Sequence, residues 1–114
     1  MARPVPGEVW MIDLGLAAKV RPCLILSDYP GPEELALLVI VPHTTSLRGN
    51  RWEFSLPKPF LKPGAFHLQQ VQPVSLPRLE RRLGVLTAAE FARLGTKLAE
   101  LLHLAPGEVA SSDG

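Results

Sequence analysis

The distribution of proline is the feature that most constrains how this chain can fold. Twelve of its 114 residues are proline, against an average share of about 5%, and eleven of them lie between Pro4 and Pro77. Proline breaks helix interiors, and in sheets it is confined to edges, strand starts and bulges. The first two-thirds of the chain are therefore expected to form short strands between turns. The one long helix is expected in the proline-free residues 78–105.

The apolar pattern predicts where the strands and the helix lie. Alternating or continuous apolar stretches place six strands at residues 9–14, 20–27, 35–41, 51–56, 65–74 and 80–86. The third stretch is apolar on both faces, which is typical of a central strand. Thr87 and Glu90 then form a capping box, and apolar residues recur at helical spacing to about Leu104.

The chain is expected to form a single domain over residues 1–114, since its length suits one compact core. That core should cover about residues 5–104, because Ala105-Pro106-Gly107 stops the helix and the polar tail over residues 105–114 is expected to fray. The fold class is mainly β with one helix: a small, strongly bent antiparallel sheet or barrel followed by a C-terminal helix.

Three features favour a protein of the reducing cytoplasm. The longest apolar run, residues 35–41, has seven residues, whereas a membrane-spanning helix needs about 20. The first residues lead into a polar turn with no apolar signal segment. Cys23 is the single cysteine, so no internal disulfide can form. We therefore expect a cytoplasmic protein without a membrane partner, in which Cys23 is a small buried apolar residue.

Charge is unevenly distributed, although the formal net charge is only +1. The near-zero total excludes a protein that is basic all over and coats nucleic acid non-specifically. Residues 42–82 nevertheless hold seven cationic residues against two acidic ones, a net of +5, and the rest of the chain carries −4. This basic segment is either a binding surface for an anion or a solvated surface whose charges cancel in space.

Polar side chains gather at the ends of the expected strands and in the loops between them. Hydroxyls, amides and arginines suit a phosphodiester ligand, because guanidinium groups pair with phosphate and the others bond to backbone or base edges. The sequence has no glycine-rich phosphate loop and no paired cysteine or histidine spacing, so we expect no cofactor and no bound metal. The candidate binding residues are Lys19, Arg21, Thr44, Thr45, Ser46, Arg48, Arg51, His67, Gln69 and Gln70.

Four segments occur in a recognisable order and spacing. They are Gly7-Glu8-Val9-Trp10 with Asp13-Leu14, then Arg21-Pro22-Cys23-Leu24-Ile25-Leu26-Ser27, then Val41-Pro42-His43-Thr44-Thr45-Ser46 with Arg48-Gly49 and Trp52-Glu53-Phe54, and finally Leu79-Glu80-Arg81-Arg82-Leu83-Gly84-Val85-Leu86. Together with the capped helix, this pattern resembles the MazF/PemK family over about residues 5–104. Members of that family are the toxins of bacterial toxin–antitoxin pairs.

The resemblance implies a fold, an activity and partners. It implies an SH3-like barrel that pairs into a homodimer. It also implies a metal-independent endoribonuclease that cleaves single-stranded RNA through the ribose 2′-hydroxyl, and a cognate antitoxin peptide that covers the RNA groove. The groove would be lined by the loop before Arg21 and the loop after Thr45, which here are residues 15–19 and 46–51.

The resemblance also assigns roles to residues. It implicates Arg21 and either Thr44 or Thr45 in cleavage. A guanidinium stays charged, since its pKa exceeds about 12, so Arg21 suits stabilisation of a dianionic phosphorane. The threonine would position the phosphate or the 2′-hydroxyl. The plain alternative for Arg21 is an ion pair on the protein surface.

The sequence departs from the family pattern in its fifth expected strand. Several members carry an Asp-Gln pair there, followed by a basic residue, whereas Gln69, Gln70 and Gln72 occupy the matching positions. Since the acid is missing, His67 is the candidate general base or acid; otherwise it is a histidine at the edge of a strand. The missing acid leaves two other interpretations. One is a non-cleaving member that binds nucleic acid or inhibits DNA gyrase, and the other is a protein-interaction module.

Overall fold

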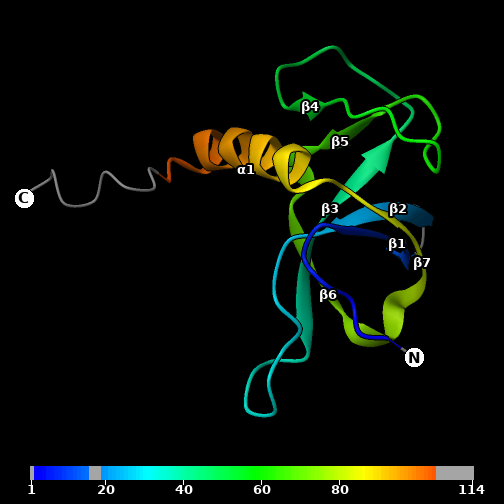
Figure 1. Cartoon of the computed structure of the whole chain (residues 1–114), viewed down its shortest axis with the longest axis vertical. Coiled ribbons are helices and arrows are strands. Elements are labelled where there is room, and N and C mark those ends of the chain that lie inside the picture. Colours follow the sequence, from blue (N-terminus) through cyan, green and yellow to red (C-terminus); the bar gives the residue numbers. More distant parts are fainter. Residues whose placement is uncertain (1, 16–18, 105–114) are drawn as a thin grey trace, which may run out of the picture.

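The computed structural model describes residues 2–15 and 19–104, which form one strongly bent sheet and one helix (Figure 1). Residues 16–18 of the expected groove loop lie outside the described residues, as do the expected helix stop and the expected frayed tail over 105–114. The elements are β1 (Glu8–Asp13), β2 (Val20–Ile25), β3 (Leu37–Thr44), β4 (Glu53–Phe54), β5 (Ala65–His67), η2 (Leu68–Gln70), β6 (Gln72–Ser75), η3 (Leu76–Arg78), β7 (Leu79–Val85) and α1 (Ala88–Leu102).

Strand β3 is the centre of the sheet, as its apolar sequence predicts. The strand order is β4-β5-β3-β2-β1-β7, with β6 also paired to β3, and all the pairings are antiparallel. The first half of β3 pairs with β6, and its last residues, His43 and Thr44, pair with β5. The predicted class, mainly β with a C-terminal helix, is confirmed. The sheet bends strongly but does not close, and β4 and β7 are its two ends.

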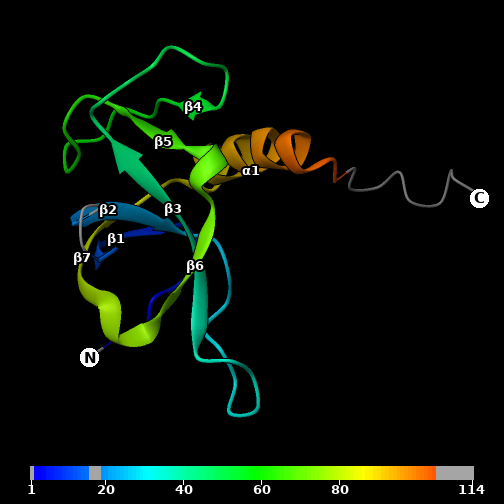
Figure 2. The same ribbon diagram turned by 180° about the vertical axis from the view of Figure 1, so that it is seen from behind.

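The third predicted strand, 35–41, is observed at Leu37–Thr44, and two other predicted strands differ more. The expected strand over residues 65–74 is wrong as one element: it is β5, a 3-10 turn and β6 (Figure 2). The turn is required because β5 and β6 pair with different halves of the same β3. Among the described strands, β6 pairs only with β3, so its other edge has no strand that needs a backbone N–H from it. Pro73, which lacks a backbone N–H, is tolerated for this reason. The expected strand over 51–56 shortens to the two residues of β4.

Two apolar clusters lie on opposite faces of the sheet. One contains Val9, Leu24 and Phe66 and packs against the helix through Leu94, all with 0% exposure. The other contains Ile12, Cys23 and Leu38. Cys23 is fully buried, as predicted, and burial raises the pKa of its thiol to about 12.

The predicted capping box begins helix α1. The Thr87 hydroxyl accepts from the Glu90 amide at 3.1 Å, while the Glu90 carboxylate accepts from the Thr87 amide at 2.8 Å. The helix ends at His103, which has a left-handed φ of 59°. Over residues 2–15 and 19–104, no helix is long and apolar enough to span a membrane.

Candidate active site

A cavity of about 460 Å³ opens where the start of β2 meets the end of β3, beside β7 and the β4–β5 loop. Its polar lining consists of Lys19, Arg21, His43, Thr44, Thr45, Ser46, Lys62 and Arg81. Its apolar lining consists of Met11, Val20, Pro22, Phe60 and Leu83. The predicted residues Lys19, Arg21, Thr44, Thr45 and Ser46 therefore lie together, although the chain separates them by more than 20 positions.

The sheet register explains why Arg21 and Thr44 line the same cavity. Cys23 faces Pro42 in the antiparallel pair of β2 and β3. Arg21 lies two residues before Cys23 and Thr44 two residues after Pro42, so each shares the face of that pair, at the start of one strand and the end of the other. Directly opposite residues in an antiparallel pair point to the same face. Ile12 pairs with Arg21 from the other side, so this row lies on the face of the Ile12 cluster.

A second row of the sheet forms the floor of the cavity. Arg81 pairs with Met11 and Met11 pairs with Pro22, while Pro22 and His43 each lie one residue beyond the Cys23–Pro42 pair. Because successive strand residues alternate between faces, this row points to the face opposite Arg21 and Thr44. The cavity thus lies around the strand ends, with a floor from one face and a rim that carries Arg21 and Thr44 from the other.

The cavity is cationic. Lys19, Arg21, Lys62 and Arg81 line it, and over residues 2–15 and 19–104 no aspartate or glutamate does. Like charges around a low-dielectric hollow reinforce one another and attract an anion. Lys19 reaches the rim through a left-handed φ of 59°, which turns the chain into β2. The arrangement suits a ligand with one or more phosphates.

Three consecutive hydroxyl residues lie at the end of β3: Thr44 is its last residue, and Thr45 and Ser46 follow it. The Thr44 hydroxyl accepts a hydrogen bond from the Ser46 amide at 3.0 Å, which fixes its oxygen and leaves its proton available to donate. Thr44 is 9% exposed, whereas Thr45 and Ser46 are open to solvent. Both threonines line the cavity; Thr44 is the buried one, with its hydroxyl held by the Ser46 amide, and Thr45 is exposed.

His43 is a cavity residue that the sequence interpretation passed over in favour of His67. It is 5% exposed, and its ring lies edge-on to Phe66 at 5.1 Å and 78°. A Cβ on Gly64 would lie 2.9 Å from the His43 Cε1, so only glycine allows the loop to pack this closely. Burial lowers the pKa of His43. Its position directly before Thr44-Thr45 is the one sequence signal that could have indicated it.

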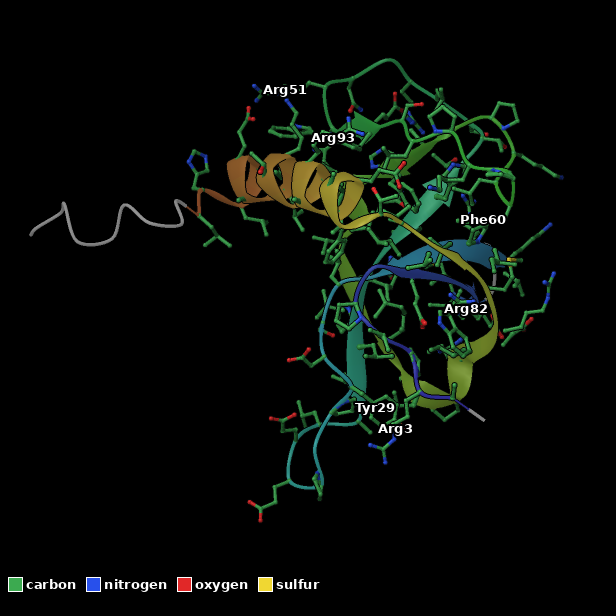
Figure 3. All side chains as sticks on the ribbon, in the orientation of Figure 1. Arg3, Tyr29, Arg51, Phe60, Arg82 and Arg93 are labelled. Atoms are coloured by element: carbon green, nitrogen blue, oxygen red, sulfur yellow. The ribbon has the colours of Figure 1, made fainter. Side chains whose placement is uncertain are left out.

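The apolar wall depends on a second glycine. Phe60, from the β4–β5 loop, lies beside β2 and β7 in Figure 3. A Cβ on Gly84 of β7 would come within 2.4 Å of the Phe60 ring. Gly84 therefore lets an aromatic face reach the cavity from a loop that is distant in sequence.

Five of the predicted site residues do not line the cavity: Arg48, Arg51, His67, Gln69 and Gln70. His67 pairs with Glu53 across β5 and β4, and its Nδ1 is buried without a hydrogen bond. Gln69 and Gln70 are exposed on η2. The Arg51 guanidinium stacks on Trp52 at 4.4 Å, beside helix α1 and away from Phe60 (Figure 3).

The loop after Ser46 is held by one carboxylate. Glu53 accepts hydrogen bonds from the backbone amides of Arg48 at 2.6 Å, Gly49 at 2.8 Å and Asn50 at 3.2 Å. The bond from the Arg48 amide contributes most to lowering the pKa of Glu53. Sequence reasoning gave Glu53 no role, yet it fixes the loop that the resemblance assigns to RNA.

Folding divides the basic segment over residues 42–82. Of its seven cations, only Lys62 and Arg81 line the cavity. Others form ion pairs: Lys58 with Glu90 at 2.8 Å, and Arg82 with Glu8 at 3.0 Å. The remaining cavity cations, Lys19 and Arg21, come from outside the segment. Within the part of the chain that the structure describes, no three acidic, histidine or cysteine side chains lie together in a way that could hold a metal.

Comparisons with known proteins agree with this geometry. No curated protein matches the sequence. An endoribonuclease in complex with its cognate antitoxin, from a mycobacterial species, is 26% identical, with a TM-score of 0.74, over 90% of this chain and 98% of that chain. MazF in the MazE–MazF structure from Deinococcus radiodurans is 24% identical, with a TM-score of 0.75, over 92% of this chain and 100% of that one.

A third solved structure, the toxin MazF-mt6 from Mycobacterium tuberculosis, is 23% identical, with a TM-score of 0.67, over 86% of this chain and 98% of that one. The family model described as the PemK-like, MazF-like toxin of type II toxin–antitoxin systems matches residues 5–102, nearly the whole described chain. The chain therefore belongs to the PemK-like, MazF-like toxin family of type II toxin–antitoxin systems.

Proposed function

We propose that this toxin is an endoribonuclease that cleaves single-stranded RNA at the cavity, with Arg21 and Thr44 at the reacting phosphate. The observation that supports the proposal is that Arg21, at the start of β2, and Thr44, at the end of β3, both line one cationic cavity. A relative at 26% identity is named an endoribonuclease. The alternative of a gyrase inhibitor is not favoured, since the matched family is MazF-like.

The chemistry follows from the side chains at the rim. The ribose 2′-oxygen attacks the adjacent phosphorus and the bond to the 5′-oxygen breaks, which leaves a 2′,3′-cyclic phosphate and a 5′-hydroxyl. Water takes the 2′-hydroxyl proton and supplies a proton to the 5′-oxygen. Negative charge grows on the phosphorane, where a guanidinium binds more strongly than in the ground state. Arg21 carries that role, and the Thr44 hydroxyl donates to a phosphate oxygen.

The other cavity cations bind the neighbouring phosphates. Lys19, Lys62 and Arg81 surround the rim and the floor, so an extended strand would place its flanking phosphates near them. Release of counterions then makes binding depend on salt, with a slope of about −0.7 per phosphate contact for single strands. If Arg21 and these three residues contact one phosphate each, log Kd should rise with log salt with a slope of about 3.

The same cationic rim suits the partners that family membership suggests. We propose a cognate antitoxin peptide with acidic side chains that competes with RNA for the cavity, and a homodimer as the active form. The mycobacterial relative is in complex with its cognate antitoxin. An acidic peptide that blocks RNA binding should lose its affinity when Lys62 and Arg81 are replaced together by alanine.

The test uses purified protein with EDTA and matched RNA and DNA strands of one sequence. The expected result is cleavage of RNA alone, with a cyclic phosphate on the 5′ product detected by mass spectrometry. A single 2′-deoxy substitution at the cut position should abolish cleavage there and leave binding unchanged. Intact RNA in this assay, or equal cleavage of the DNA strand, would overturn the proposal.

A further inference from the structure

The floor of the cavity has a chemistry different from that of its rim. Met11, Pro22, Phe60 and Leu83 give it apolar walls, which contribute nothing to the binding of a phosphate. The floor residues Met11 and Pro22 lie in the row that points away from Arg21 and Thr44. A phosphate at the rim and a flat apolar group on the floor could therefore occupy the cavity together.

Phe60 lines that space with an aromatic ring. Its ring is half-buried against Gly84, which has no Cβ to push it out of the wall. Single-stranded RNA is read by unstacking a base and laying it on an aromatic side chain, while polar groups meet the edge of the base. The cavity volume of about 460 Å³ is enough for one nucleotide rather than a stretch of helix.

His43 supplies a polar group on the same floor. Its ring is fixed by Phe66 and by the close passage of Gly64. The structure shows no hydrogen bond to either ring nitrogen from the rest of the described chain, and neither nitrogen is among the enclosed, unpartnered atoms. Burial lowers the pKa of His43, so its ring is neutral at pH 7 and offers one donor and one acceptor.

The charged side chains that line the cavities around His43 are all cationic. The charged residues that line the cavity with it are Arg21 on β2, Arg81 on β7, Lys19 before β2 and Lys62 from the β4–β5 loop. Lys58 lines a neighbouring cavity that His43 also borders. All five are cationic, and a second positive charge on the imidazole would be repelled.

We propose that the cavity floor is a specificity pocket for one unstacked RNA base next to the cut, with Phe60 as its stacking face and His43 as its reader. This inference rests on the proposed function for the identity of the ligand as RNA. Proton transfer by His43 is less consistent with the register, because the row of His43 points to the face opposite Arg21 and Thr44. The floor selects the base, and the rim acts on the phosphate.

The test compares intact and abasic RNA on matched protein variants. Sequencing of the products from a randomised strand first identifies the preferred base beside the cut. An abasic nucleotide at that position should lower kcat/KM of the wild type by about 10–100-fold, the range expected for a lost base stack. Phe60→Leu, which keeps an apolar side chain, should lower it similarly on intact RNA. On abasic RNA, Phe60→Leu should cause little further loss.

Three variants complete the comparison. His43→Asn should relax base preference at that one position, with RNAs of the disfavoured bases cut at nearly their wild-type rates. Phe91→Leu, an aromatic residue of α1 outside the cavity lining, should leave the preference unchanged. His103→Asn is the matched control for His43→Asn and should also leave the base preference unchanged. Asparagine tolerates the left-handed conformation of His103 at this helix end.

Several outcomes would overturn the pocket. If Phe60→Leu lowers kcat/KM on abasic RNA by the same factor as on intact RNA, the two losses are independent. The base would then lie away from Phe60. Loss of cleavage on every sequence in His43→Asn, with a changed pH profile of kcat, would make His43 a proton carrier instead. The same RNAs with a 2′-deoxy nucleotide at the cut position are not cleaved, so their Kd values report binding alone. These values separate the proposed nuclease activity from the proposed base pocket. Selective binding without cleavage refutes the nuclease and keeps the pocket, whereas cleavage without selectivity at any position refutes the pocket alone.

Discussion

The cavity end of the molecule and the side covered by helix α1 hold similar numbers of basic residues but use them differently. On the helix side, Lys58 pairs with Glu90 at 2.8 Å, and Arg51 and Lys97 both lie over the Trp52 ring. In the cavity, the cations share their walls with hydroxyls and apolar groups, and none of the described carboxylates lines it. The helix-side cations thus contact a carboxylate or an aromatic ring of the fold, whereas the cavity gathers several cations around one hollow.

Three glycines show that the two regions also differ in packing. A Cβ on Gly64 would lie 2.2 Å from the Thr44 carbonyl oxygen, and one on Gly84 would lie 2.4 Å from the Phe60 ring. On α1, Gly95 has open space around it. The cavity residues are therefore held by close contacts that a single methyl group would disturb, whereas the outer face of the helix tolerates substitution.

The largest effect on stability is expected from Gly64→Ala. Its methyl group would press on the backbone of Thr44, which cannot move without breaking the pairing of β3 and β5. We expect a loss of about 3 kcal/mol or more in the free energy of unfolding, measured by urea denaturation. An unchanged midpoint would show that the cavity end is as loosely packed as the helix face.

Gly84→Ala tests the same contrast with a smaller effect. The Phe60 ring can swing away from the added methyl group, so the loss of stability should lie at the low end of about 1–3 kcal/mol. The KM for RNA should rise because Phe60 leaves the wall. Gly95→Ala is the matched control and should raise stability by about 0.5–1 kcal/mol, since alanine favours helix and meets no neighbour. A loss of stability in Gly84→Ala with a gain in Gly95→Ala would support the difference in packing between the cavity and the helix face. A change of the same sign in both variants would contradict it.

Glu53→Gln tests whether the loop beside the cavity is held in advance of binding. The amide has one acceptor oxygen in place of two, so it cannot accept from all three backbone amides that the carboxylate binds. Hydrogen exchange at the Arg48 and Gly49 amides should accelerate by about tenfold while the core strands stay protected. Glu80→Gln, at an exposed position of β7, should leave those amides unchanged. Equal exchange in the two variants would remove Glu53 from this role.

The smallest effect is expected from the ion pair on the helix side. The hydrogen bond from Lys58 contributes most to lowering the pKa of Glu90 from its ordinary value near 4.5. A carboxylate whose pKa is lower in the folded state stabilises the fold above its unfolded pKa, and that stability is lost as pH falls through the folded pKa. Glu90→Gln should lower the thermal midpoint by a few degrees at pH 7 and by less near pH 3, as followed by helical circular dichroism. A constant difference across this range would contradict the linkage.

Local patterns in the sequence were sufficient for some features and not for others. The proline-free stretch and the Thr87–Glu90 box predicted the helix, because capping depends on residues three apart. The apolar run of β3 predicted its central place. The split of residues 65–74 could not be predicted, since it depends on β5 and β6 pairing with different halves of β3.

The same distinction applies to the candidate site. Arg21 and the Thr44-Thr45 pair could be nominated because they lie within segments that resemble the family, next to expected strand ends; the choice between the two threonines could not be made from the sequence. Phe60 and Arg81 could not, because they reach the cavity only through a loop that packs on Gly84 and through the pairing of β7 with β1. His43 and His67 are chemically alike in the sequence, and only the register assigns one of them to the cavity floor.

One measurement tests the central claim that the cavity rim, and not basic charge in general, cleaves RNA. Single-turnover cleavage of a single-stranded RNA in EDTA is compared for the wild type, Arg21→Ala and Arg93→Ala, the last an exposed arginine on α1. Arg21→Ala should lower the rate by about 10²–10³-fold while the thermal midpoint stays close to that of the wild type, and Arg93→Ala should cut at the wild-type rate. Equal rates for the two variants, or a greater loss in Arg93→Ala, would contradict the account.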